Sequence, residues 1–402
     1  MKNLILFDSD VRDHLLPLTF TRPVGELRVG ILTICEKWER WLGGKASYIT
    51  QDYLADKYPI VISDQNYVIN AAVLPTKQLC HVIEQLSANE ALLSQGELIA
   101  ARLDEYQFTR LMNDDDIGEL AGFEGDPTML VKIDQLADLF SLNEQAIRDD
   151  FDLLTAGRVS QPLGETNLVL GAEQVFLEEG AVVEGATLNA RTGPIYIGKD
   201  AEVMEGALIR GPFALCEHGT VKMGAKIYGG TTIGPWSKAG GEIGNSVLLA
   251  YSNKGHDGYL GHAYLGEWCN LGADTNNSNL KNNYAEVKLW DYATERFELT
   301  GTQFCGLIMG DHSKCGINTM FNTGTVVGVS ANIFGSGFPR NFIPSFSWGG
   351  AGGFTTYSTE KAFETAELVM TRRQQQLSAE DRIILLRIFE DTAKYRRWEK
   401  KN

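Results

Sequence analysis

The sequence lacks a surplus of positive charge. Its 402 residues include 36 lysines and arginines against 52 aspartates and glutamates, so the formal net charge is −16. Nucleic-acid partners need clustered lysine and arginine side chains for their phosphate backbones, so this composition argues against them. A small anionic substrate is compatible with it, provided that a few basic side chains converge locally.

Cysteine motifs and long apolar runs are lacking too. The six cysteines form no Cys-x-x-Cys motif and no disulfide framework. No stretch approaches the roughly 18 apolar residues of a membrane span. The opening MKNLILFDSD has an apolar run too short for a signal peptide, and acids stand where a cleavage site would lie. We therefore expect a cytoplasmic protein with neither a membrane nor a nucleic-acid partner.

The first 155 residues alternate short apolar runs with helical patterns, which is typical of an α/β sheet domain. The patterns predict strands and helices in turn, the strands at 3–7 and 59–63 and the helices at 31–42, 76–86 and 136–154. A chain of this length is expected to hold two or more domains. We predict that the α/β domain covers residues 1–157 and that the Gln-Pro-Leu-Gly run at 161–164 marks its boundary.

Aliphatic residues then recur at every sixth position. One register runs through Ile197, Val203, Ile209, Leu215, Val221, Ile227 and Ile233, and a second through Met309, Cys315, Phe321, Val327 and Ile333. Mostly small residues lie four places after each. A six-residue period is the signature of a parallel β-helix, in which each hexad forms one flat face and its aliphatic side chain points inward. We predict a left-handed β-helix over 165–350, then C-terminal helices over 355–402, the second opened by a capping box of Ser378 and Asp381.

The stretch KGHDGYLGHAYLGEWCNLGADTNNSN (254–279) resembles the acetyltransferase domain of the bifunctional glucosamine-1-phosphate acetyltransferase/N-acetylglucosamine-1-phosphate uridyltransferase family. The family's run is Gly or Pro, His, two residues, Tyr, an aliphatic residue and Gly, then Asn, an aliphatic residue, Gly and Ala. These positions fall on 255–261 and 270–273, and the closing Asn of the motif falls on Asn279. The resemblance implies acetyl transfer from acetyl-CoA to glucosamine-1-phosphate or a related amino-sugar phosphate.

Within this resemblance His256 corresponds to the general base. An ammonium group must lose a proton before it attacks a thioester, and a neutral imidazole suits that task near neutral pH. The family positions imply substrate contacts for Tyr259, Asn270, Asn279 and Glu242. The family's phosphate-binding lysine is replaced by Gly244, which leaves as basic candidates Lys226, Lys254 and Lys281. Acetyl-CoA contacts are implied, across an insertion at about 282–300, for Ala273, Ile317 and Gly335, and the implied assembly is a homotrimer.

The N-terminal half resembles a shortened, diverged form of the family's nucleotidyltransferase domain. DSDVRDHLLPLTFTRPVGEL (8–27) keeps Pro-Leu-Thr at 17–19 and Pro23, but the glycine loop has become Asp-Ser-Asp and the lysine after Pro23 is Val24. The resemblance implies a Rossmann-like fold that transfers a nucleotidyl group from UTP or dTTP to a sugar-1-phosphate with Mg²⁺. Candidate nucleotide-binding cations are Arg12, Arg22 and Arg28, and candidate metal ligands are Asp8 and Asp64.

Three alternatives stay open. The chain could be a sugar-1-phosphate nucleotidyltransferase only, acting for example on glucose-1-phosphate, with a structural β-helix. Against this, a scaffold has no need of His256 and Tyr259 at the family spacing. A zinc enzyme is disfavoured because His256 and His262, six residues apart, would occupy successive faces. A non-catalytic assembly protein is the third alternative. For the N-terminal half taken by itself, a degenerate domain kept for structure stays open as well.

Overall fold

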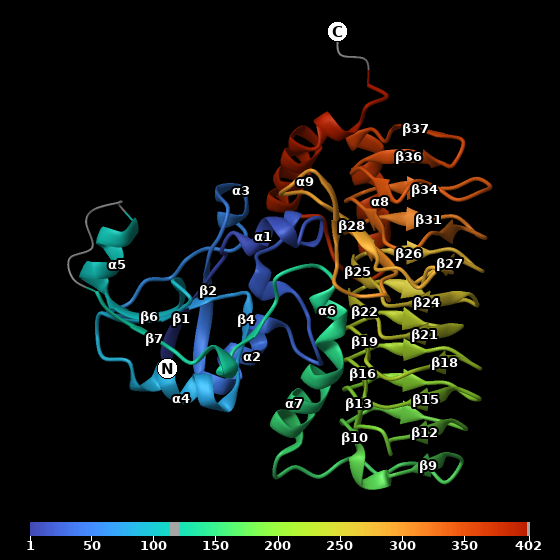
Figure 1. The fold of residues 1–402 in the computed structure, drawn as a ribbon. Helices are drawn as coiled ribbons and strands as arrows, with labels where there is room; N and C mark the ends of the chain where they lie inside the picture. The colour runs from blue at the N-terminus through green and yellow to red at the C-terminus, as the bar shows by residue number, and fades with distance from the viewer. Residues whose placement is uncertain (113–119, 400–402) are drawn as a thin grey trace. The chain divides into compact units, whose positions relative to one another are not determined.

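The computed structural model describes residues 1–112 and 120–399 (Figure 1). The chain divides into two compact units, and each is described by itself. The first comprises Met1–Leu15, Thr21–Leu27 and Leu32–Asp134, and the second comprises Leu16–Phe20, Arg28–Ile31 and Gln135–Asn402. None of the helices in the described ranges has the length and apolar character needed to cross a membrane.

A six-stranded sheet forms the centre of the first unit, in the order β2-β1-β3-β6-β5-β7. β1 pairs in parallel with β2 and β3, whereas β6 runs antiparallel to β3 and β5. This parallel centre flanked by helices is the expected Rossmann-like arrangement, and the α/β prediction is confirmed. The strands are β1 (Lys2–Phe7), β2 (Gly44–Ile49), β3 (Gln65–Asn70), β5 (Glu90–Ser94), β6 (Glu97–Asp104) and β7 (Ala121–Glu124), with the short pair β4 (Val73–Leu74) and β8 (Val131–Lys132).

The helices of this unit are α1 (Val11–His14), α2 (Ile34–Leu42), α3 (Asp52–Ala55), α4 (Lys77–Gln85) and α5 (Glu105–Met112). The helices expected at 31–42 and 76–86 are thus confirmed with shorter bounds. The strand expected at 59–63 is wrong, because these residues are irregular and the strand follows at β3. Val61 and Ile62 are half exposed, whereas Val68 and Ile69 are buried beside β1. Two apolar runs lie close together here, and only the second pairs with the sheet.

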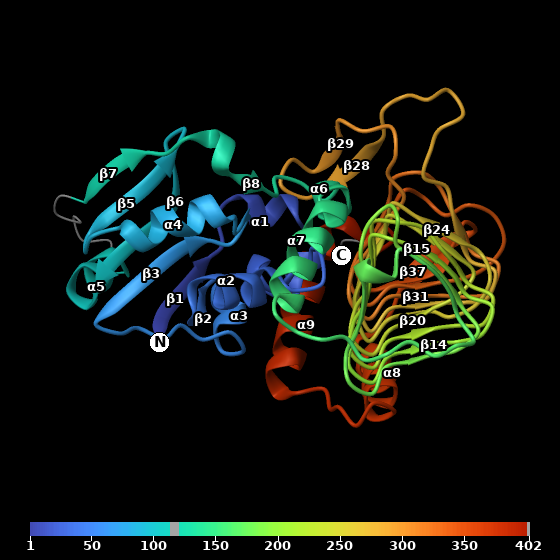
Figure 2. The ribbon, with the colours of Figure 1, turned by 90° about the horizontal axis from the view of Figure 1, so that it is seen from below.

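The second unit is a left-handed parallel β-helix, as the six-residue period predicts. Three faces run along it, each built from one short strand per coil, and Figure 2 shows the coils superimposed. Each coil is three hexads long, so Ile197 pairs with Leu215 and Val203 with Val221 on the next coil. Every aliphatic residue predicted to point inward is buried, with an exposed fraction of 5% or less. One continuous apolar core therefore fills the helix.

The strands of the β-helix are grouped here by face, and the names first, second and third face are kept below. The first face holds β10 (Val175–Leu177), β13 (Ile195–Ile197), β16 (Phe213–Leu215), β19 (Thr231–Ile233), β22 (Val247–Ala250), β25 (Tyr264–Glu267), β30 (Leu307–Met309), β33 (Thr325–Val327) and β35 (Phe342–Ile343). The second face holds β11 (Val182–Val183), β14 (Glu202–Val203), β17 (Thr220–Val221), β20 (Lys238–Ala239), β23 (Asn253–Lys254), β26 (Asn270–Leu271), β31 (Lys314–Cys315), β34 (Asn332–Ile333), β36 (Ser347–Gly350) and β37 (Gly353–Thr356). The third face holds β9 (Leu168–Leu170), β12 (Thr187–Asn189), β15 (Leu208–Arg210), β18 (Lys226–Ile227), β21 (Glu242–Gly244) and β24 (Tyr259–Gly261). A separate pair, β27 (Asn276–Asn277) with β32 (Met320–Phe321), follows β24 in the stack, and an antiparallel hairpin of β28 (Lys288–Asp291) and β29 (Arg296–Leu299) interrupts the repeat.

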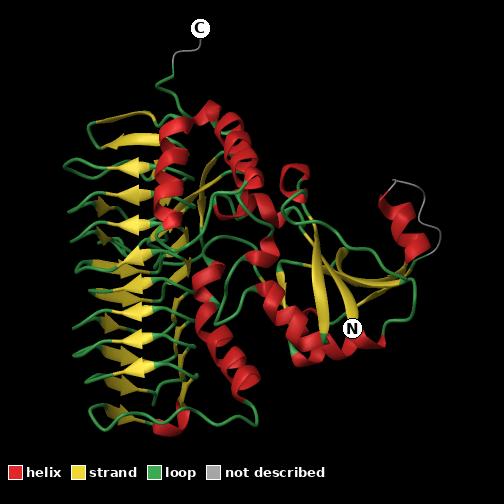
Figure 3. Cartoon of the chain, turned by 180° about the vertical axis from the view of Figure 1, so that it is seen from behind, coloured by secondary structure: helices red, strands yellow, loops and turns green. Residues whose placement is uncertain are grey.

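Among the described residues, four α-helices belong to the second unit, and Figure 3 draws the helices in red. The helix expected at 136–154 is present as α6 (Asp138–Ser141) and α7 (Asn143–Thr155), and α7 packs against β16 and β19. This differs from the expected division, because the fully buried Asn143 amide donates hydrogen bonds to Gly230 O and Thr232 Oγ1 of the β-helix. The C-terminal helices are α8 (Thr359–Thr371) and α9 (Ala379–Asp391), and the predicted capping box of Ser378 and Asp381 is confirmed.

The inward-pointing aliphatic side chains should contribute more to stability than their outward-pointing neighbours. Ile209 is 2% exposed and its strand neighbour Leu208 is 50% exposed on the outer side of β15. We expect Ile209→Ala to lower the free energy of unfolding by about 2–5 kcal/mol, because it leaves a cavity in a packed core. The matched control Leu208→Ala should change it by less than about 1 kcal/mol, measured by chemical denaturation. Equal losses in the two variants would contradict the inward repeat.

Candidate functional site

His256 lies in the turn that joins the second face to the third. The turn follows β23 and leads into β24, and the side chain of His256 is exposed. Gly258 has a φ of +114°, and a Cβ there would lie 2.2 Å from Thr275 O of the next coil. Only glycine therefore fits this close approach of two turns. The turn presents the imidazole to solvent from a backbone that is stacked on its neighbours.

Three predicted site residues stand one above the other on the third face. Lys226 pairs with Glu242 and Glu242 with Tyr259 in the strand register, so their side chains project from successive coils. They line a pocket of about 320 Å³, together with Asp257, the neighbour of His256, and with Asn276. Lys226 is exposed and makes no side-chain hydrogen bond or ion pair with the described residues. The pocket therefore combines an available ammonium and a phenol with three carboxylates, those of Glu242, Asp257 and Asp274.

Asn279 holds the Tyr259 side chain in place. Its Nδ2 donates to Tyr259 Oη at 2.9 Å and contacts His262 Nδ1 at 2.8 Å. A Cβ on Gly261 would lie 2.3 Å from Tyr259 Oη, so the glycine leaves the space that the phenol occupies. Because Tyr259 Oη accepts from Asn279, its own hydrogen remains available to a ligand. The structure thus brings Tyr259 and Asn279 together, as expected for a shared site.

His262 is the residue that sequence reasoning missed in this cluster. Its ring stacks on Phe304 with centroids 5.0 Å apart and meets the edge of Phe140 at 5.9 Å. Burial lowers the pKa of His262 to about 4, so the imidazole is neutral near pH 7. Nδ1 accepts the Asn279 hydrogen bond, which leaves the ring proton on Nε2. The sequence offered a signal only in the six-residue spacing from His256.

Lys254 is not available as a phosphate ligand, which corrects the prediction made for it. Its side chain is fully buried and occupies an inward position of the second face, paired with Ala239. The ammonium donates to three backbone carbonyl oxygens, those of Gly240, His256 and Asp257. Burial lowers the pKa of Lys254 to about 8. Lys254 therefore fastens the His256 turn from inside the helix.

The remaining acetyl-site residues lie on the second face or at its edge. Asn270 is exposed on β26, on a different face from Tyr259. Ala273, Ile317 and Gly335 follow β26, β31 and β34, just as His256 follows β23, and these four strands are consecutive neighbours. All four residues therefore lie along one corner of the β-helix. Lys281 directly precedes the insertion and donates to Glu286 O within it.

In the first unit, Asp8 and Arg12 lie at the C-terminal end of β1. Asp8 accepts hydrogen bonds from the Val24 N–H at 2.8 Å and from Thr50 Oγ1 at 2.6 Å, and burial raises its pKa. Arg12 is 7% exposed and donates to Asp13 at 2.6 Å and to Tyr53 Oη at 2.6 Å. This is the sheet edge at which nucleotides bind in such folds.

Asp64 and Arg28 do not join that group. Asp64 is exposed before β3, and β3 runs parallel to β1, so Asp64 and Asp8 lie at opposite edges of the sheet, roughly 20 Å apart. They cannot share a metal ion. Arg28 belongs to the second unit, where its guanidinium donates to Leu249 O and Ile31 O, whereas Arg22 is buried in the first. Among the described residues, no three His, Cys, Asp or Glu side chains gather as a metal site requires.

The lowered pKa of His262 makes a prediction about stability. Between about pH 6.5 and pH 4 the unfolded chain binds a proton here that the folded chain does not, so the free energy of unfolding falls as the pH is lowered. We expect His262→Gln, which cannot titrate, to reduce this slope by up to about 1.4 kcal/mol per pH unit. Denaturation curves between pH 4 and 7 measure it. The exposed His81→Gln is the control, and an unchanged slope in His262→Gln would refute a buried neutral imidazole.

Residues 4–159 match the model of a family described as sugar nucleotidyl transferase. Two similar curated proteins are both named bifunctional protein GlmU. The one from Bordetella parapertussis is 26% identical over 236 residues, which is 49% of this chain and 51% of the relative. The one from Methanocaldococcus jannaschii is 33% identical over 87 residues, 22% of this chain and 21% of the relative. The chain spans about half the length, or less, of these relatives.

Among solved structures, the polySia specific acetyltransferase NeuO is similar, with a TM-score of 0.26 and 15% sequence identity. The match covers 48% of this chain and 87% of that one. The family match locates a transferase domain in the N-terminal part of the chain, and the six-residue repeat accounts for the part that follows. The chain therefore joins a region similar to the sugar nucleotidyl transferase family to a hexapeptide-repeat β-helix, and this arrangement is similar in part to the GlmU proteins.

Proposed function

We propose that the β-helix transfers an acetyl group from acetyl-CoA to an amino-sugar phosphate, with glucosamine-1-phosphate as the first candidate. The observation that carries this proposal is the pocket in which Lys226, Glu242 and Tyr259 stand on successive coils beside the His256 turn. Coils about 4.8 Å apart spread these three side chains over about 10 Å. The ammonium and the phenol suit the phosphate and hydroxyl groups of such a ligand, and the carboxylates of Glu242, Asp257 and Asp274 suit its amino group.

His256 acts in this proposal as the general base. Its exposed imidazole accepts the proton that the sugar ammonium must lose before the nitrogen attacks. Tyr259, oriented by Asn279, donates its hydroxyl hydrogen to the sugar, and Lys226 offers its ammonium to the phosphate. Lys254 is a positioning residue, since it binds the carbonyl oxygens of the turn that carries His256.

Acetyl-CoA binds, in this proposal, along the corner of the β-helix that holds His256, Ala273, Ile317 and Gly335. Bound there, acetyl-CoA supplies the acetyl group as a thioester. Ala273 and Gly335 are small and Ile317 is 69% exposed, so the corner is open along its length. Three coil spacings of about 4.8 Å separate His256 from Gly335, about 14 Å in all. A homotrimer is part of the proposal, because a site between subunits accounts for Asn270 standing on a different face from Tyr259.

The N-terminal domain is proposed to transfer a nucleotidyl group from UTP or dTTP to a sugar-1-phosphate. The match of residues 4–159 to the sugar nucleotidyl transferase family supports this reaction class. Arg12 stands at the sheet edge where the triphosphate would bind. The described residues do not fit a resident Mg²⁺, because both Asp8 oxygens already accept hydrogen bonds and no acidic cluster surrounds them.

The acetyl-transfer proposal is tested by His256→Ala. We expect acetylation of glucosamine-1-phosphate to fall by about 100-fold or more, the usual effect of losing a general base, while nucleotidyl transfer is unchanged. His218→Ala is the matched control, since His218, like His256, lies in a turn between strands of the β-helix. Coenzyme A release measures the first reaction and pyrophosphate release the second. Full acetylation by a folded His256→Ala protein would remove His256 from the mechanism.

The nucleotidyl-transfer proposal is tested by Arg12→Ala. We expect loss of turnover of UTP or dTTP with sugar-1-phosphates and intact acetyl transfer, because the two reactions use separate sites. Arg40→Ala removes an exposed arginine of α2 and should leave both reactions unchanged. A thermal melt checks folding, since Arg12 is buried. If the wild-type protein binds no nucleoside triphosphate with Mg²⁺ by calorimetry, the domain has lost its activity and acetyl transfer alone remains.

A further inference from the structure

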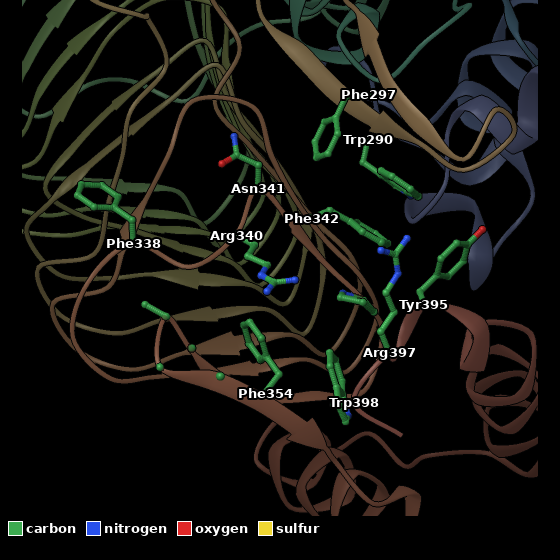
Figure 4. A pocket seen from close by; sticks show the side chains of 15 residues that line it. Trp290, Phe297, Phe338, Arg340, Asn341, Phe342, Phe354, Tyr395, Arg397 and Trp398 are labelled. Atoms are coloured by element: carbon green, nitrogen blue, oxygen red, sulfur yellow. The ribbon is translucent and has the colours of Figure 1, made fainter. Parts of the chain in front are cut away.

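A second pocket, of about 890 Å³, lies at the C-terminal coils of the β-helix and takes no part in the site above (Figure 4). Four segments form it: the hairpin β28–β29, residues 338–344 around the start of β35, residues 350–354 where β36 turns into β37, and residues 395–398 after α9. Its volume is within the range of about 300–1,000 Å³ that small-molecule sites occupy.

Aromatic rings form two walls of this pocket. On one side Trp290 stacks on Phe342, with centroids 4.2 Å apart and planes 12° from parallel. On another, Phe354 stacks on Trp398 at 5.8 Å. The indole N–H of Trp290 is buried and has no hydrogen-bond partner among the described residues. Such walls offer flat faces to a planar ring, which stacks on them without demanding one particular pattern of donors and acceptors.

Two charged residues line the pocket in the described part of the chain, and both are arginines. Arg340 and Arg397 are exposed, and neither side chain makes a hydrogen bond or ion pair with the described residues. Among the residues that the structure describes, no aspartate or glutamate lines the pocket, although the whole chain has a net charge of −16. Figure 4 shows the two guanidinium groups among the aromatic rings. Paired arginines of this kind suit phosphate groups, which they bind through two parallel N–H donors.

The wall contributed by the C-terminal segment is held in place. Arg396 is 1% exposed; it donates to Phe389 O at 3.0 Å and to Glu399 at 2.7 Å, and its guanidinium lies 4.1 Å over the Phe389 ring. Trp398 Nε1 donates to Thr356 Oγ1 of β37 at 2.9 Å. Arg397, between these anchors, is therefore presented to a pocket that is already formed.

We propose that this pocket binds a nucleotide: a planar base lies against the aromatic walls and its phosphates lie against Arg340 and Arg397. Two sources supply this chemistry, the adenosine bisphosphate end of a coenzyme A molecule and a nucleotide or nucleotide sugar. The proposal concerns only residues from 290 onward and is measured by binding, so it stands or fails independently of the proposed reactions.

The test is calorimetric titration of the full chain with four probes: adenosine 3′,5′-bisphosphate, UDP, adenosine and inorganic phosphate. We expect at least one of the nucleotides to bind about tenfold or more tightly than both adenosine and phosphate. The double variant Arg340→Gln/Arg397→Gln should weaken that binding by at least about tenfold. Phe354→Leu should lower the affinity for the nucleotide and leave the affinity for inorganic phosphate unchanged. Arg191→Gln, an exposed arginine elsewhere on the β-helix, should bind as the wild type does.

Some outcomes of this titration identify the source of the nucleotide, and others overturn the proposal. Preference for adenosine 3′,5′-bisphosphate identifies coenzyme A as the source, and preference for UDP identifies a uridine nucleotide; either supports the site. The proposal is overturned if no nucleotide binds at millimolar concentration or if phosphate alone binds as well as the nucleotides. It is also overturned if a folded double arginine variant, checked by its thermal melt, keeps wild-type affinity.

Discussion

The stacking of one inward aliphatic side chain per hexad is the constraint on which the second unit depends. Ile209 on one coil lies over Ile227 on the next, and the same alignment repeats on each face. Because alternate side chains of a strand point to opposite sides, an aligned core also aligns the residues outside it. Lys226, Glu242 and Tyr259 form a row for this reason. The row of candidate substrate-binding side chains is therefore a geometric consequence of the packing in the core.

A polar side chain inside the β-helix stabilises the position of residues on its surface. Lys254 occupies an interior position, and burial of its ammonium is tolerated because three carbonyl oxygens of the adjacent turns surround it. The same hydrogen bonds restrain the turn that presents His256. The neutral His262 similarly joins the packed aromatic side chains to the Asn279–Tyr259 pair. A buried lysine and a half-buried histidine thus support the residues that face solvent.

Two of the four segments that build the second pocket lie outside the hexad rule. The hairpin β28–β29 interrupts the repeat, and residues 395–398 follow the last helix. Neither needs to supply inward aliphatic residues, so both can carry aromatic and basic side chains. In a chain of net charge −16, a surface with two arginines and no acid concentrates the local positive potential where an anion would bind. Core and pocket therefore follow different composition rules within one unit.

The sequence by itself determined the β-helix and its inward residues, because the six-residue period is local and each hexad repeats the same burial. It also determined the capping box at Ser378 and the pairing of Tyr259 with Asn279 in one site, through a motif of fixed spacing. Only the tertiary structure decided that Lys254 points inward. From the sequence, a lysine in a strand is expected to be exposed, and only the pairing of Lys254 with the buried Ala239 shows otherwise. The tertiary structure also decided that Asp64 lies far from Asp8, because a strand at 59–63 would have brought Asp64 to the same sheet edge, whereas β3 begins after it. Such placements depend on pairing between distant strands, which no local pattern specifies.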